Sequence, residues 1–273
     1  MVLPKIKEVM NVLNFTKKSF TKGGFRLVGN YINGLIFLAK KTVNKIAKAS
    51  SEVNHQQKLN RILNEAKFEK KFLEERYLQK IRYLFKNSKV YLIIDDTLNK
   101  REGKCVEETQ YHYDHSTDID VKGHQFFTSI LYTPFLQLPL FPELYSKNTD
   151  SKIELAKDLI DKIKDSSIKI NTVLFDSWYS DEKIINKCKK LLKARVICGI
   201  KTNRNIKFKR SWKEYKLSFI TDRIPLKDKF SYEIEGEKYR VTSYEANLNK
   251  VQSVRLVISE RYSKKENHGT KFI

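Results

Sequence analysis

The chain has 273 residues, of which 40% are hydrophobic and 12% aromatic, so it can bury a substantial core and is not disordered by composition. It contains 54 Lys and Arg and 32 Asp and Glu, which gives a net charge of +22. This charge favours a polyanionic partner, with nucleic acid the first candidate and an anionic membrane surface the second. A Lys-rich compositional bias explains part of the excess. No run of about 20 apolar residues is present, which excludes a membrane span, and the N-terminus is not a convincing signal peptide. No C-x-x-C pair occurs, so neither a zinc ribbon nor a disulfide framework is supported. These features predict a cytoplasmic protein.

Residues 1–87 are basic and have helical periodicity. Residues 31–49 carry apolar side chains at spacings of three and four, Gly23 and Gly24 predict a break before them, and Thr42 suits the start of a helix in a small helix-turn-helix unit. The pattern predicts a helical DNA-binding region, with plain packing of helices as the equal alternative.

Residues 88–204 alternate between strands and helices. Strands are expected at 90–94, 125–133, 138–140, 171–175 and 195–200, and amphipathic helices at 152–164 and 182–192. The first strand is expected to end at Asp95 and the fourth ends at Asp176. This order predicts an α/β fold.

Residues 205–262 have strand-like alternation, and Gly236 between glutamates suits a hairpin turn. We expect an antiparallel β insertion here. The last residues, 270–273, resemble the beginning of a further strand.

Asp95 and Asp176 form the candidate catalytic pair. Carboxylates held at strand ends can bind a pair of Mg²⁺ or Mn²⁺ ions, which prefer oxygen ligands and drive phosphoryl transfer on DNA. An aspartate after a strand is also a common helix cap, and Asp181, just before the helix at 182, is expected to be such a cap.

The motifs around both acids resemble those of DDE transposases from prokaryotic insertion sequences. Ile93–Thr97 (IIDDT), with Lys100, Gly103-Lys104 and Gly123–Gln125 after it, is similar to their first-acid region, and Val173–Ser180 (VLFDSWYS) to their second. The helices before and the β-rich segment after resemble the other parts of these enzymes, so the likeness covers nearly the whole chain.

This resemblance implies a ribonuclease-H-like mixed sheet flanked by helices, with an N-terminal helical region and an antiparallel β insertion. The corresponding parts are residues 1–87, 88–204, 205–262 and 263–273, the last being the start of a final core segment. The implied function is metal-dependent cleavage and strand transfer at insertion-sequence ends, with terminal-repeat and target DNA as partners and a homodimer in the synaptic complex. The family pattern places the ligand at Asp95, and Asp96 faces away if the strand continues through both.

The third acid of the family pattern, a glutamate on a helix, has no match. Glu260 and Glu266 lie in a charged segment that favours solvated side chains, and the chain is expected to be a truncated copy. An inactive DNA-binding remnant and a ribonuclease-H-like nuclease acting on other nucleic acids are the alternatives.

Other candidate contacts are weaker. Trp178 suits either stacking on a base or packing at the turn. A basic cluster is expected to contact phosphate and consists of Lys201, Arg204, Lys207, Lys209 and Arg210. A metal site built from His112, Asp114, His115 and His124 is less favoured than structural roles for these residues. No phosphate-binding glycine loop or nucleophile elbow is present, which disfavours nucleotide hydrolysis and acyl transfer.

Overall fold

The computed structural model describes residues 7–53, 55–65, 69–101, 103, 106–209, 211–221, 223, 230–248, 250–261 and 271–272. The chain divides into two compact units, Met1–Lys86 and Asn87–Ile273. Within the described ranges, no helix is both long and apolar enough to cross a membrane.

The first unit is helical, as predicted. Its elements are α1 (Lys7–Leu13), the 3-10 turn η1 (Asn14–Ser19), α2 (Lys22–Phe37), α3 (Val43–Ala49), α4 (Gln56–Glu65), α5 (Lys70–Ile81) and the 3-10 turn η2 (Arg82–Phe85). Its buried cluster joins α3 and α4 through Ile46 and Leu59, and side chains of α2 such as Leu27 and Tyr31 pack against it.

The start of α2 differs from the expectation, because the predicted break at Gly23 and Gly24 is wrong. The Thr21 hydroxyl caps the helix by accepting from the Gly24 backbone N–H, so the two glycines lie in its first turn. The expected start at Thr42 is confirmed, since its hydroxyl accepts from the Lys45 N–H and begins α3.

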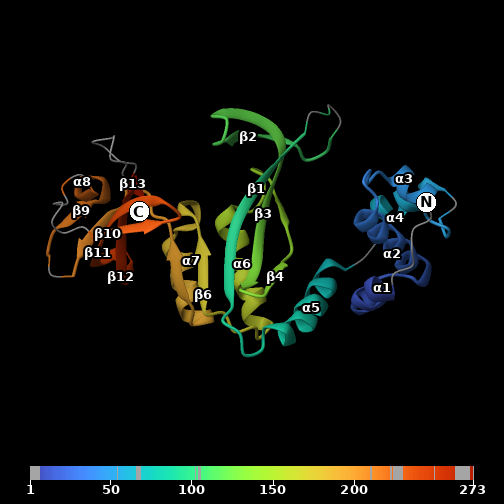
Figure 1. The fold of residues 1–273 in the computed structure, drawn as a ribbon, viewed down its shortest axis with the longest axis horizontal. Coiled ribbons are helices and arrows are strands. Elements are labelled where there is room, and N and C mark those ends of the chain that lie inside the picture. The colour runs from blue at the N-terminus through green and yellow to red at the C-terminus, as the bar shows by residue number, and fades with distance from the viewer. Residues whose placement is uncertain are drawn as a thin grey trace. The chain divides into compact units, whose positions relative to one another are not determined.

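The second unit is built on a mixed sheet, which confirms the predicted α/β class (Figure 1). Its strands are β1 (Tyr91–Lys100), β2 (Gln110–Asp114), β3 (Ile119–Thr133), β4 (Leu136–Pro139), β5 (Glu143–Tyr145), β6 (Thr172–Phe175) and β7 (Arg195–Cys198). The order is β2-β3-β1-β6-β7, with β4 and β5 also pairing β3. The strand β1 runs antiparallel to β3 and parallel to β6, which is parallel to β7. An antiparallel half and a parallel half thus meet at β1, as a ribonuclease-H-like sheet requires.

One face of this sheet forms the core. The side chains of Leu92 and Ile94 on β1 are buried, as are Phe127 on β3 and Val173 and Phe175 on β6. The opposite face is less covered, since the register partners Ile93, Ile130, Leu174 and Ile197 share it, and Ile130 and Ile197 are 37% and 53% exposed.

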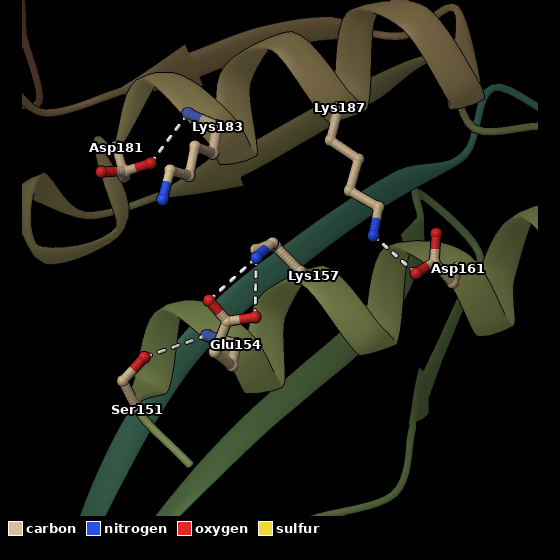
Figure 2. A network of polar contacts seen from close by, with 7 residues as sticks. All are labelled: Ser151, Glu154, Lys157, Asp161, Asp181, Lys183 and Lys187. Atoms are coloured by element: carbon tan, nitrogen blue, oxygen red, sulfur yellow. Dashed lines mark hydrogen bonds and ion pairs between the residues drawn. The ribbon is translucent and has the colours of Figure 1, made fainter.

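Two helices flank the sheet, α6 (Lys152–Asp165) and α7 (Glu182–Lys187), and a π-helical turn, η4 (Cys188–Leu192), continues α7. Ser151 caps α6 through the Glu154 N–H, and Lys187 joins the two helices by pairing with Asp161 at 2.5 Å (Figure 2). The Asp181 carboxylate accepts from the Lys183 N–H at 2.7 Å, which confirms its expected role as the cap of α7.

A second, antiparallel sheet follows, as expected for the β insertion. Its elements are β8 (Asn205–Phe208), β9 (Glu214–Lys216), α8 (Leu217–Thr221), β10 (Phe230–Ile234), β11 (Glu237–Leu248), β12 (Val251–Arg261) and β13 (Lys271–Phe272). The order is β13-β12-β11-β8-β9, with β10 also pairing β11. The hairpin at Gly236 is confirmed, because Glu235 and Gly236 both have positive φ, at 51° and 80°. The strand expected at 270–273 is the short β13, which pairs with β12 in this sheet.

Candidate active site

Asp95 lies inside strand β1 and not at its end, so the expected end at Asp95 is wrong. Pairing with β3 continues from Tyr91 opposite Tyr132 to Lys100 opposite Gly123. The apolar residues stop at Ile94, which suggested that the strand ends there. The long partner strand β3 continues to pair with β1 beyond this residue. The Asp95 backbone carbonyl accepts from the Thr128 hydroxyl at 3.2 Å, which adds a side-chain bond to the same pairing.

Asp96 points to the other side of β1. Exposure alternates along the strand, so that Asp96 shares the core face with Leu92 and Ile94, while Asp95 is exposed on the opposite face. The Asp96 carboxylate accepts from the Gln125 amide at 2.9 Å and pairs with the Lys152 ammonium.

Asp176 follows β6 directly, one residue after the paired positions Ile94 and Phe175, so it lies level with Asp95. Its Oδ1 accepts from the Trp178 backbone N–H at 2.9 Å and caps the turn η3 (Ser177–Tyr179). The cap and the candidate ligand are therefore one side chain, and the two interpretations of this residue do not exclude one another.

The pKa of the Asp176 carboxyl is raised above its ordinary value, first by partial burial. The negative charges of Asp95 and, to a smaller extent, Asp96 raise it further, while the backbone N–H groups of Trp178 and Tyr179 lower it. The carboxylates of β1 and β6 thus lie close enough to repel one another, and this region favours a cation.

The donor set fits a hard divalent cation in part. Asp95 and Asp176 offer carboxylate oxygens of the kind that Mg²⁺ and Mn²⁺ prefer, and Mg²⁺ commonly keeps several waters beside one or two protein carboxylates. Within the described ranges there is no group of three or more His, Cys, Asp or Glu side chains placed to hold a metal ion. Glu260, expected in a charged turn, instead lies in β12 opposite Arg240, and Glu266 lies outside the described residues.

Trp178 stands beside the carboxylates and is 54% exposed, which is more than a packing anchor requires. The Lys201 ammonium lies 4.2 Å from its ring centroid and that of Lys152 lies 5.3 Å away. Gly199 permits the approach of Lys201, because a Cβ there would be 3.2 Å from the Ser177 backbone nitrogen. The backbone next to Asp176 thus touches the loop that carries Lys201.

The predicted basic cluster is divided between two places. Lys201 and Arg204 line one hollow with Asn203 and Asn205. Farther along, the Lys207 ammonium lies 5.6 Å from the ring centroid of Trp212, and Lys209 pairs with Glu245 at 2.9 Å. Arg210 lies outside the described residues.

The histidines are not brought together into a site. His112 is buried against the Tyr145 ring, and burial, followed by the charges of Lys147 and Lys152, lowers its pKa. His115 packs edge-on against Tyr113, and His124 bonds to the Glu107 carbonyl at 2.8 Å.

Sequence reasoning missed two residues near the carboxylates, Lys152 and Tyr179, and an exposed aromatic residue farther along the chain, Trp212. Lys152 was expected only as the first residue of a helix, and Tyr179 only as part of the second-acid motif. The Tyr179 side chain is buried against Phe127, and its hydroxyl has no hydrogen-bond partner among the residues that the structure describes. Trp212, which is 94% exposed, could have been found as an aromatic residue within a basic segment.

Comparison with known proteins adds a family. Residues 19–211 match a family model described as DDE superfamily endonuclease. The solved synaptic complex of piggyBac transposase with hairpin DNA matches at 10% identity and a TM-score of 0.39, covering 97% of this chain and 59% of that one. The Drosophila P element transposase strand transfer complex matches at 11% identity and a TM-score of 0.26, covering 78% and 54%. The chain thus spans less than two thirds of either transposase, and no curated protein matches it.

Proposed function

Because the chain belongs to the DDE superfamily endonucleases, we propose that it is a transposase-type enzyme that cleaves and joins DNA at the ends of an insertion sequence. The observation that carries the proposal is the position of Asp95 and Asp176, each directly after the last β1–β6 pair, Ile94 with Phe175, where the charge of Asp95 contributes to the raised pKa of Asp176.

In this proposal Asp95 and Asp176 hold Mg²⁺ or Mn²⁺. Ions held there would supply activation of the attacking water or 3′-hydroxyl and stabilisation of the leaving oxygen. The protein orients the two carboxylates, through the β1–β3 ladder for Asp95 and through the Trp178 N–H for Asp176.

DNA would lie along the basic side chains next to this pair. The proposed contacts are Trp178, Lys201, Arg204, Lys207, Lys209 and Arg210. The net charge of +22 supports a polyanionic partner. A homodimer that brings two DNA ends together in a synaptic complex is part of this proposal.

Nicking of supercoiled DNA in Mg²⁺ or Mn²⁺ tests the function. We expect the wild-type chain to nick the DNA, and Asp95→Asn and Asp176→Asn to lose this activity, because an amide is a much poorer ligand for a hard cation. Asp181→Asn is the matched control, since asparagine caps helices about as well as aspartate does. Nicking that survives in Asp176→Asn rejects the proposed site.

A protein that binds DNA without cutting it is the second candidate. It is favoured by the small ligand set, since the described part of the chain has no group of three or more His, Cys, Asp or Glu side chains placed to hold a metal ion. In that case the wild-type chain binds DNA but leaves it intact with either metal, and Asp176→Asn binds DNA equally well.

A further inference from the structure

Asp95, Asp96 and Asp176 form a carboxylate cluster, in which the charges of the first two raise the pKa of the third. Lys152 places a positive charge beside the Asp96 member of this cluster. Its ammonium pairs with Asp96 and lies 5.2 Å and 5.3 Å from the ring centroids of Tyr145 and Trp178. The side chain is only 16% exposed. This cation is therefore held by a carboxylate and two aromatic faces, on the side of β1 opposite to Asp95.

The position of Lys152 on its own helix is unfavourable. It is the first residue of α6, where the unpaired N–H groups create a partial positive charge that disfavours a cation. Removing an ammonium from water adds a further cost. The position on the helix therefore does not explain why a lysine stands here. The pairing of its ammonium with Asp96 does.

We propose that Lys152 is a resident counter-ion of the carboxylate cluster, which neutralises Asp96 in the metal-free protein and limits the affinity for divalent cations. This inference rests on the proposed metal site at Asp95 and Asp176. Lys152 is a positioning residue, because it acts through Asp96 and through its charge.

The physical basis is competition between like charges. An ammonium near the cluster repels an incoming divalent cation, and its pairing with Asp96 offsets a negative charge that would otherwise attract that cation. When a divalent cation binds, Lys152 releases Asp96, and the Tyr145 and Trp178 rings keep a place for the ammonium nearby.

Mn²⁺ titration of the full chain by calorimetry tests this inference. Removing one positive charge at this range is expected to tighten binding on the order of tenfold in Lys152→Met. Lys152→Arg keeps the charge and is expected to stay within about twofold of wild type, in line with that charge-based argument. Lys157→Met is the matched control, because Lys157 lies on the same helix and pairs with Glu154 at 2.6 Å (Figure 2).

The outcomes separate the inference from the function it rests on. If wild type does not bind Mn²⁺, or if Asp176→Asn binds it as well as wild type does, the metal site itself is rejected. If wild type binds Mn²⁺ and Lys152→Met binds it equally or more weakly, the metal site stands and the role of Lys152 is overturned.

A second measurement uses the wild-type chain alone, so it does not depend on whether the Lys152 variants fold. Amine labelling followed by mass spectrometry reports how accessible each lysine is. Added Mn²⁺ is expected to increase labelling of Lys152 and to leave Lys157 unchanged. Labelling of Lys152 that does not rise at a Mn²⁺ concentration that saturates the site overturns the inference.

Discussion

At the scale of single residues, Asp176 performs two tasks at once. Its Oδ1 caps the turn that carries Trp178, and its charge lies beside those of Asp95 and Asp96. The capping bond favours the ionised form, whereas burial and the neighbouring charges disfavour it. The net pKa shift of Asp176 is upward, so burial, together with the smaller effect of the neighbouring charges, outweighs the backbone hydrogen bonds.

This balance predicts how the metal-free protein responds to pH. An acid whose pKa is higher in the folded state binds its proton more tightly there, so stability falls as pH rises from the unfolded pKa to the folded pKa. Asp176→Asn removes the charge and can keep the cap. In EDTA, we expect this variant to melt at a higher temperature than wild type at neutral pH, with the difference vanishing toward acid pH.

Thermal unfolding at a series of pH values measures this difference, and Asp181→Asn serves as the control that changes another capping aspartate. Equal melting temperatures of wild type and Asp176→Asn at every pH would contradict the raised pKa.

The sequence could identify the two acids but not their surroundings. Asp176 follows an apolar run and sits in a recognisable motif, so its position could be read locally. The pairing of Lys152 with Asp96 joins residues that are 56 positions apart, and no periodicity within either segment reveals it. Such contacts follow from how α6 packs on the sheet, which is a tertiary property.

At the scale of elements, the contact of α2 with α3 depends on a glycine. A Cβ at Gly34 would lie 2.5 Å from Ile46 Cγ2, and Ile46 is fully buried in the cluster of the first unit. By contrast, a Cβ at Gly23, also in α2, has no neighbour within 4 Å. One helix therefore contains a glycine needed for packing and a glycine that packing does not require.

We expect Gly34→Ala to destabilise the protein by about 1–3 kcal/mol, because the added methyl group overpacks a filled core. Gly23→Ala is expected to stabilise it by about 0.5–1 kcal/mol, since alanine favours helix more than glycine does. Urea unfolding followed by circular dichroism measures both changes. If the two variants shift the midpoint in the same direction, the packing of Ile46 on Gly34 is wrong.

Element types were predictable where periodicity was strong, as for α6 and for β6. Element ends were less predictable, because they depend on partners. Gly23 and Gly24 looked like a helix break, but the Thr21 cap starts the helix before them. Similarly, β1 runs past its apolar residues because β3 continues to pair with it.

At the scale of the whole molecule, the charge of +22 predicts DNA binding that weakens steeply with salt. Each phosphate contact releases counterions and contributes about −0.9 to the slope of log K against log salt concentration. Replacing Lys201, Arg204, Lys207 and Lys209 together by glutamine is expected to reduce the magnitude of this slope by up to about 4, if each side chain contacts one phosphate.

Fluorescence anisotropy with labelled duplex at several salt concentrations measures this slope. Lys157→Gln with Lys187→Gln is the control for lost charge, since both lysines are paired within the α6–α7 network (Figure 2). A slope that changes as much in the control as in the fourfold variant places the DNA elsewhere on the protein.

The adjacent aspartates on β1 have one more consequence. A strand that slips by one residue turns each side chain to the opposite face, and usually exchanges a polar face for an apolar one. Here a slip in one direction would put Asp96 where Asp95 was, whereas a slip in the other direction would put Ile94 there. The doublet thus keeps an acid level with Asp176 for one of the two possible one-residue slips. The two acids differ in their surroundings. Asp96 contacts the Lys152 ammonium and the Gln125 amide, whereas Asp95 lies near the Asp176 carboxylate.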